Sequence, residues 1–317
     1  MILQVILLII GFVILIKGAD IFVDGASSLA QNFKLSKMVI GLTIVAFGTS
    51  APEFAVSVKS IISNNSDMVL GNVIGSNIFN ILLIVGICSL IRPVCVKNNT
   101  IKKEMPIVIL FSFLLFMLIK DDLFISGITN EITRNDGIVI LLFFTIFIYY
   151  LISIVRNKRD NDAFANAPFG VFKSFLFTGL GIVCIILGSN AVVDSASVIA
   201  SVLGVSQRMI ALTVVAFGTS LPELVTSIVS IRKGEQEILV GNIVGSNIFN
   251  IGVVLGVPVA LFGGIRAVGF NTIDLIVLLL SAILLFLFSI REKKINKIGG
   301  IVMLLIFVVY YSFVIVG

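Results

Sequence analysis

Apolar residues follow one another along this chain in runs of about 20, separated by short polar breaks. A run of that length crosses the hydrocarbon core of a bilayer as an α-helix, whereas the alternation over about 10 residues that marks a membrane β-strand does not occur. The pattern therefore predicts an all-α polytopic membrane protein with ten transmembrane helices. The expected spans are 2–24, 37–61, 68–90, 104–120, 136–155, 170–194, 207–231, 237–262, 270–290 and 298–316.

Composition supports a lipid bilayer as the environment. Hydrophobic residues make up 58% of the 317 positions, charged residues 12%, and the mean hydropathy is +1.19, which no water-soluble domain of this size tolerates. The first run exceeds a signal-peptide core, and we expect it to remain as a helix. The net charge of +5 comes from Lys and Arg in short loops rather than on one face, so no nucleic-acid partner is predicted.

Other compositional features exclude several kinds of chemistry. The chain contains no His, which rules out histidine metal sites and catalytic triads that use His. Cys88, Cys95 and Cys184 lie at no metal-ligand spacing and provide no disulfide framework. Neither Ser50 nor Ser220 lies beside an activating base, so we do not expect an intramembrane hydrolase. The prediction is a protein that is not an enzyme and needs no cofactor and no obligatory protein partner.

Self-comparison shows an internal duplication. Residues 41–53 (GLTIVAFGTSAPE) and 211–223 (ALTVVAFGTSLPE) are identical at 10 of 13 positions, offset by 170. At the same offset, residues 71–81 (GNVIGSNIFNI) match 241–251 (GNIVGSNIFNI) at 9 of 11 positions. The chain therefore consists of two related halves.

Five spans per half is an odd number, so the second half is expected to enter the membrane from the opposite side. We predict a five-helix membrane repeat over 1–155, a short cytoplasmic linker at 156–169 and an inverted five-helix repeat over 170–317. With the N-terminus outside, most of the 22 Lys and Arg residues fall in inner loops, as the positive-inside rule requires. A multi-pass cell-membrane protein with both termini extracellular is expected.

The motifs GTSAPE and GTSLPE place Glu53 and Glu223 near the middle of two apolar spans. An ionised carboxylate at the bilayer centre costs about 2.5–3.5 kcal/mol on insertion scales, so a pair of them indicates a function. Cation binding would compensate that cost, and two negative charges match one Ca²⁺ or two monovalent cations. A structural polar pair is the alternative, and the duplication makes it less favourable.

Oxygen ligands surround both glutamates. Hydroxyl and amide side chains repeat at helical spacing, and Pro52 and Pro222 are expected to free backbone carbonyls of nearby Ala and Thr residues. Calcium takes 6 to 8 such oxygens, and sodium accepts the same atoms. The predicted ion ligands are Glu53, Glu223, Thr49, Thr219, Ser50, Ser220, Ser76, Ser246, Asn80, Asn250, Ala46 and Ala216. Four further amides are expected to brace the interrupted helices instead: Asn72, Asn77, Asn242 and Asn247.

At these motifs the chain resembles the calcium/cation antiporter superfamily, specifically its prokaryotic sodium/calcium exchanger branch. The duplicated repeats of that family correspond to 41–61 with 68–86 and to 211–231 with 237–256. The resemblance implies that Glu53 and Glu223 coordinate Ca²⁺ with help from the Thr49 and Thr219 carbonyls. It also implies sodium sites at Ala46, Ser50, Ser76, Ala216, Ser220 and Ser246.

The resemblance implies a secondary antiporter that exchanges Na⁺ for Ca²⁺ by alternating access. Proton/calcium exchangers of the superfamily typically carry a Glu in the helix where this chain has Ser76-Asn77 and Ser246-Asn247. Potassium-dependent relatives typically carry Asp at the position of Asn250. Sodium is therefore the expected driving ion. A proton/calcium antiporter that uses the same two glutamates is the alternative, and a cation channel is a second one.

Overall fold

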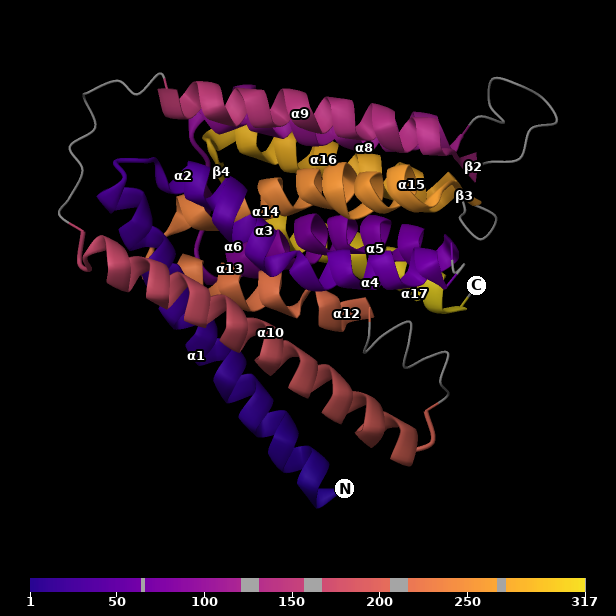
Figure 1. Ribbon diagram of the computed structural model, residues 1–317, viewed down its shortest axis with the longest axis horizontal. Helices are drawn as coiled ribbons and strands as arrows, with labels where there is room; N and C mark the ends of the chain where they lie inside the picture. The colour runs from indigo at the N-terminus through magenta and orange to yellow at the C-terminus, as the bar shows by residue number, and fades with distance from the viewer. Residues whose placement is uncertain (64–65, 121–130, 157–166, 206–215, 267–271, 317) are drawn as a thin grey trace.

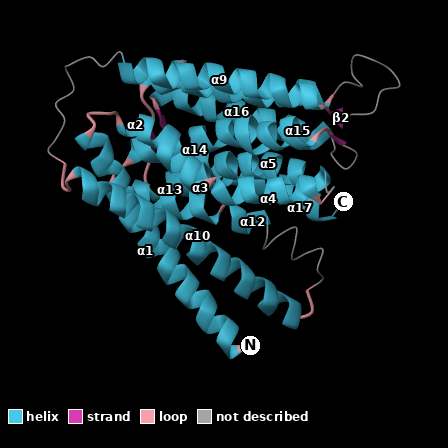
Figure 2. Ribbon diagram, in the orientation of Figure 1, coloured by secondary structure: helices cyan, strands magenta, loops and turns pink. Residues whose placement is uncertain are grey.

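The computed structural model of the chain describes residues 1–63, 66–120, 131–156, 167–205, 216–266 and 272–316. Within these ranges the chain is largely helical, with four short strands (Figure 2). The α-helices are α1 (Ile2–Asn32), α2 (Lys37–Ile40), α3 (Ala46–Thr49), α4 (Ala51–Ile62), α5 (Ser66–Ile78), α6 (Gly86–Ile91), α7 (Asn98–Lys102), α8 (Glu104–Ile119), α9 (Arg134–Arg156), α10 (Val171–Val202), α12 (Ala216–Thr219), α13 (Leu221–Lys233), α14 (Gln236–Phe249), α15 (Gly256–Phe262), α16 (Thr272–Glu292) and α17 (Lys297–Val316). Wider π-helical turns occur in η1 (Gly41–Val45), η2 (Phe79–Val85) and η5 (Asn250–Leu255), and the strands are β1 (Val94–Cys95), β2 (Glu131–Ile132), β3 (Ile265–Arg266) and β4 (Lys294–Ile295).

Two long segments form the interior of the bundle: one runs from α5 through η2 to α6, and the other from α14 through η5 to α15. The most apolar stretch of the first segment is 72% buried, and that of the second is 89% buried. In the other helices of spanning length the corresponding stretch is only 17–33% buried. Small residues permit this burial, because they let backbones approach closely. At one crossing, a Cβ added to Gly241 of α14 would lie 2.8 Å from the Cα of Gly41.

Two further helices break inside the bundle. The stretch 37–49 meets α4 at a bend of 46°, and Ser50 lies at the break with φ −84° and ψ 7°. Ser220 occupies the same place between α12 and α13, with φ −91° and ψ 6°. Proline explains both breaks, because Pro52 and Pro222 lack the N–H that would bond the carbonyl four residues earlier and their rings clash with it.

Helices α1 and α10 pack along each other and extend away from the rest of the bundle (Figure 1). Glycines on both helices make this contact close, since a Cβ added to Gly188 would lie 2.6 Å from the backbone nitrogen of Leu15. Where the two helices cross, Ser174 Oγ lies 2.8 Å from Ser28 Oγ, and Asn32 Nδ2 donates to the Phe169 carbonyl at 2.8 Å. The pair is therefore one tightly packed unit.

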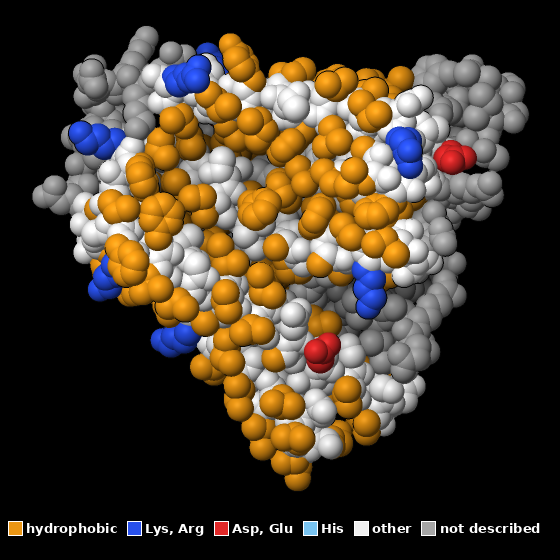
Figure 3. Space-filling model, viewed as in Figure 1, with side chains coloured by type: hydrophobic (Ala, Val, Ile, Leu, Met, Phe, Trp, Pro, Cys, Tyr) orange, Lys and Arg blue, Asp and Glu red, His pale blue; other side chains and the backbone are white. Residues whose placement is uncertain are grey.

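The outer helices present apolar side chains to the surroundings. In Figure 3 hydrophobic side chains cover much of the visible face, and most of the charged ones lie toward its left and right edges. Large apolar residues such as Phe172, which is 81% exposed, and Val309, which is 71% exposed, lie at the surface of the molecule. Such an extensive apolar surface suits lipid rather than water.

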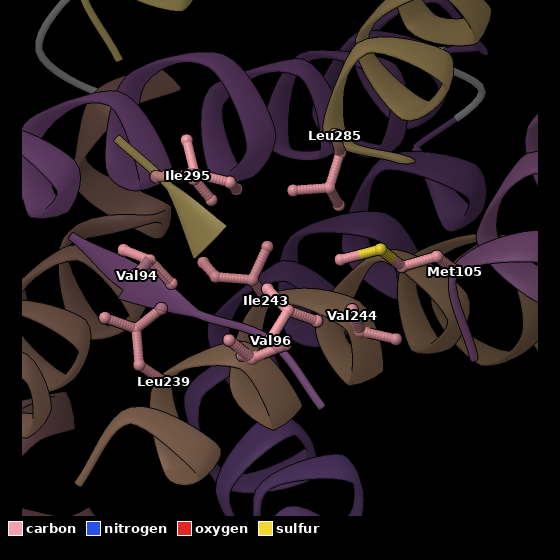
Figure 4. A pocket seen from close by; sticks show the side chains of 10 residues that line it. Val94, Val96, Met105, Leu239, Ile243, Val244, Leu285 and Ile295 are labelled. Atoms are coloured by element: carbon pink, nitrogen blue, oxygen red, sulfur yellow. The ribbon is translucent and has the colours of Figure 1, made fainter. Parts of the chain in front are cut away.

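Two antiparallel ladders join loops that are distant in sequence. In one, Val94 of β1 pairs with Ile295 of β4, and in the other Glu131 of β2 pairs with Arg266 of β3. The ladders lie at opposite ends of the bundle in Figure 1. Beneath the first, Val94 and Ile295 point into a small cavity whose lining is wholly apolar (Figure 4).

The predicted spans coincide with helices in the described part of the chain. Seven of these helices are long and apolar enough to cross a membrane, or eight if α4 and the stretch before it count as one span. Helix α8, over the predicted span 104–120, has 16 residues. In the predicted span 207–231 only residues from 216 onward are described, as α12 and α13. The all-helical membrane architecture is confirmed, and the count of ten remains a prediction.

Candidate functional site

Glu53 and Glu223 each contact the serine at the break of the other half. Ser50 Oγ donates to Glu223 Oε1 at 2.9 Å, and Ser220 Oγ lies 3.2 Å from Glu53 Oε1. All four side chains are fully buried. Because each serine precedes its own glutamate by three residues, about one helical turn, these two contacts bring both carboxyl groups into one central site.

The second oxygen of each carboxyl group is buried without a partner. Glu53 Oε2 and Glu223 Oε2 have no hydrogen bond, and neither glutamate forms an ion pair within the described part of the chain. Buried polar atoms are nearly always paired, and an exception calls for a physical explanation such as an absent ion. The two oxygens are therefore available as cation ligands.

Two amides add further unpaired oxygens. Asn80 is fully buried, and neither its Oδ1 nor its Nδ2 forms a hydrogen bond. Asn250 Nδ2 donates to Asn77 Oδ1 at 3.1 Å, which leaves Asn250 Oδ1 without a partner. This contact orients the Asn250 amide, while nothing described orients that of Asn80. Both residues lie in the wider π-helical turns of η2 and η5, a feature often found at functional sites.

Of the four amides expected to brace the helices, Asn72 and Asn242 make bonds between helices. Asn72 Nδ2 donates to the Glu53 carbonyl at 2.9 Å and to Ser57 Oγ at 3.0 Å, which ties α5 to α4. In the other half, Asn242 Nδ2 lies 3.3 Å from Ser227 Oγ, and Asn242 Oδ1 accepts from Thr49 Oγ1 at 3.0 Å. These bonds hold the broken helices in register around the glutamates.

Two further predicted ligands, Ser76 and Ser246, contact residues of this site. Ser76 Oγ lies 3.2 Å from Ser220 Oγ, and Ser246 Oγ lies 3.5 Å from Asn242 Oδ1. Thr219 is partly buried and has a polar contact. Ala216 begins α12.

The expected release of backbone carbonyls needs a correction. The Ala46 carbonyl accepts the Ser50 N–H at 3.0 Å, so Pro52 does not free it. A proline deprives the carbonyl four residues earlier, which is Gly48 for Pro52 and Gly218 for Pro222. The Gly218 carbonyl accepts instead from Ser189 Oγ of α10 at 2.9 Å. The Ala46 carbonyl also lies 3.4 Å from Thr49 Oγ1, so a cation that used this oxygen would compete with that contact.

Three polar residues near the site are not among the predicted ones. Ser189 Oγ donates a hydrogen bond to the Gly218 carbonyl. Because Ser189 lies on another helix, α10, no local sequence pattern predicts this contact. Thr226 Oγ1 and Ser230 Oγ of α13 are buried without hydrogen bonds. Their spacing from Glu223, three and seven residues, is the helical pattern that would have identified them.

The chemistry of the site favours hard cations. The groups that it offers are two carboxylates together with hydroxyl, amide and carbonyl oxygens. The described residues contain no group of three His, Cys, Asp or Glu residues that could hold a metal, which leaves neutral oxygens to complete any coordination shell. An all-oxygen site selects alkali and alkaline-earth ions over transition metals.

Comparison with known proteins agrees with this chemistry. The model of the family described as sodium/calcium exchanger protein matches residues 3–153 and 173–316. The chain is 37% identical to a putative antiporter, CaxA, of Alkalimonas amylolytica, over 98% of each chain. It is 32% identical to the sodium/calcium exchanger MaX1 of Methanosarcina acetivorans, over 79% of this chain and 81% of that one.

Solved structures show the same fold. A structure of the sodium-calcium exchanger NCX_Mj soaked without Na⁺ and Ca²⁺ superposes with a TM-score of 0.83, at 32% identity over 99% of each chain. A second structure, soaked with 2.5 mM Na⁺ and 1 mM Sr²⁺, gives a TM-score of 0.84 at 31% identity over 98% of each chain. The chain therefore belongs to the sodium/calcium exchanger protein family.

Proposed function

We propose that this protein exchanges Na⁺ for Ca²⁺ across the membrane, with both ions binding in turn between Glu53 and Glu223. The observation that carries the proposal is the pair of buried, unpartnered Oε2 atoms of these glutamates. One Ca²⁺ or two Na⁺ would neutralise the two charges, so the ions compete for one site. An empty site would retain two uncompensated charges at depth, which favours obligatory exchange over leak.

Neutral oxygens complete the proposed ligand set. Ser50, Ser220, Ser76 and Ser246 supply hydroxyls, and Asn80 and Asn250 supply amide oxygens that have no other partner in the described residues. Backbone carbonyls of Thr49, Thr219, Ala46 and Ala216 are the further candidates. A cation that binds here would exchange its hydration shell for these oxygens.

Alternating access would arise from two inverted five-helix repeats. The ladder β1–β4 joins the loop after the third predicted span of the first repeat to a late loop of the second, and β3–β2 makes the converse connection at the opposite end. This arrangement supports an inverted duplication with ten spans. The tightly packed α1–α10 unit would move against the other helices and expose the site to one side at a time.

Transport into liposomes tests the proposal. Protein reconstituted in Na⁺-loaded liposomes should take up ⁴⁵Ca²⁺ on dilution into Na⁺-free buffer at equal pH, and replacement of internal Na⁺ by K⁺ or choline should abolish the uptake. Glu53→Gln and Glu223→Gln should each abolish it, because either one removes half of the site's charge.

Glu104→Gln is the matched control, since Glu104 is also buried, at 3% exposure, but its partner is Tyr150 of α9. This variant should retain uptake. Uptake that continues without Na⁺ and follows an imposed pH gradient would instead establish a proton/calcium antiporter.

A further inference from the structure

An ion pair ties α1 to the last residue of α13. Lys233 Nζ lies 2.7 Å from Asp24 Oδ1 and 3.5 Å from Asp20 Oδ1, and it donates to the Asp20 carbonyl at 2.9 Å. One turn further along α1, Ser27 Oγ donates to Glu235 Oε1 at 3.0 Å. Both contacts join the α1–α10 unit to the segment that leads from the central site to this end of the bundle.

Among the described residues, the other half shows no equivalent of this ion pair. At the offset of 170, Asp194 of α10 corresponds to Asp24, but Ser63 corresponds to Lys233. Asp194 is exposed and forms no ion pair with any described residue. The duplicated halves therefore differ in how firmly each end of the bundle is held closed.

Helix α13 presents two different stripes next to this contact. Leu221, Val225 and Val229, four residues apart, belong to the apolar cluster that includes α1 residues such as Phe22 and Val23. Beside this stripe, Glu223, Thr226 and Ser230 form a polar stripe at spacings of three and four residues. Lys233 follows Ser230 by three residues and lies where both stripes end.

Two hydroxyl residues of the polar stripe are unusual because they are buried without a hydrogen-bond partner. Thr226 and Ser230 are fully buried, and their hydroxyl oxygens have no hydrogen bond. Helical Ser and Thr can satisfy such an oxygen by bonding the carbonyl four residues earlier, as Ser289 does with Leu285 at 2.7 Å. The two unpaired hydroxyls can instead bind water or a passing cation.

We propose that Thr226 and Ser230 line an ion passage from Glu223 to the end of α13, and that the ion pair of Lys233 with Asp20 and Asp24 is its gate. While α1 lies against α13, the apolar contact and the ion pair close the passage. When the α1–α10 unit moves away, the pair breaks and the polar stripe becomes open to the water at that end. Because this half alone carries the pair among the described residues, the gate favours the state in which this end is closed. That the passage carries Na⁺ and Ca²⁺ rests on the proposed function.

Thiol labelling tests the gate. In a background of Cys88→Ala, Cys95→Ser and Cys184→Ala, Ser230→Cys introduces a thiol on the polar stripe. Sealed vesicles of each orientation are treated with a membrane-impermeant thiol reagent, and the rate of modification is measured from each side. The thiol should react from the side that carries Lys233, and Lys233→Gln should raise its rate about two- to fivefold, the range expected for a partly exposed ion pair.

Matched variants make the result specific. Lys97→Gln breaks an ion pair with Glu237 of 2.8 Å at the same end of the bundle, but neither residue belongs to α1, so the rate should not change. Exchange of the charges by Asp24→Lys with Lys233→Asp should restore the slow rate. Thr226→Cys replaces Ser230→Cys if the latter reduces the yield of monodisperse protein.

Either of two outcomes would overturn the gate: Lys233→Gln labels no faster than its parent, or Lys97→Gln accelerates labelling equally. Labelling needs no transported ion, so it is independent of the proposed function. If the parent protein shows no Na⁺-driven Ca²⁺ uptake while labelling responds to Lys233, the exchange proposal fails and the gate stands. If uptake occurs while labelling is unaffected, the reverse holds.

Discussion

Substitution of Gly188 tests whether the α1–α10 unit depends on close backbone contact. A Cβ at this position would lie 2.6 Å from the Leu15 nitrogen and 2.8 Å from its Cα, and the Gly11 carbonyl oxygen is 2.9 Å away. These are backbone atoms, which cannot rotate aside as the end of a flexible side chain can. Gly188→Ala therefore requires the two helices to separate by about 0.8 Å to reach an ordinary contact of 3.4 Å.

The expected loss of stability follows from this displacement. Overpacking of a close contact costs about 1–3 kcal/mol, and the higher helix propensity of alanine offsets up to about 1 kcal/mol. A net loss of about 1–2 kcal/mol corresponds to a fall in Tm of roughly 2–4 °C for a chain of this length. The substitution changes no charge and no hydrogen-bonding side chain, so a fall in Tm reports the change in packing alone.

Gly179→Ala is the control, since it lies on the same helix and a Cβ there would meet nothing within 4 Å. Thermal unfolding in one detergent, followed by loss of monodisperse protein, compares both variants with the parent. The control should keep its Tm or gain about 1 °C from helix propensity. Equal Tm values for the two variants would refute the close contact and show that α1 and α10 are not tightly packed at this position.

Two further substitutions, one of them with a matched control, test hydrogen bonds made by residues that are not predicted ion ligands. Tyr310→Phe removes the hydrogen bond of 2.9 Å to Asp274 and should lower Tm by about 1–3 °C without loss of Ca²⁺ uptake, whereas Tyr149→Phe, at a 73% exposed position, should change neither property. Ser189→Ala leaves the Gly218 carbonyl without its donor and should lower Tm by a similar amount; an unchanged Tm would show that another group replaces the hydroxyl.

The sequence predicted the helical membrane architecture and the central position of Glu53 and Glu223 because both depend on local patterns. Apolar runs of spanning length identify helices, and a duplicated carboxylate motif stands out against them. The two strand ladders escaped prediction, since a pair such as Val94 with Ile295 joins loops 201 residues apart and has no local pattern. The predicted release of the Ala46 carbonyl was wrong because Pro52 acts on the carbonyl four residues before it, not six.

By itself, the sequence determined where the helices lie, that the chain is duplicated, and which oxygen-bearing residues share a helical face, because periodicity and composition act along a single helix. Only the tertiary structure decided which atoms remain available for ions. Ser50 contacts the glutamate of the opposite half, and Asn250 is oriented by Asn77 while Asn80 is not. It also decided that Lys233 meets Asp20 and Asp24. Each of these contacts joins residues on separate helices, and their distance depends on how the helices pack.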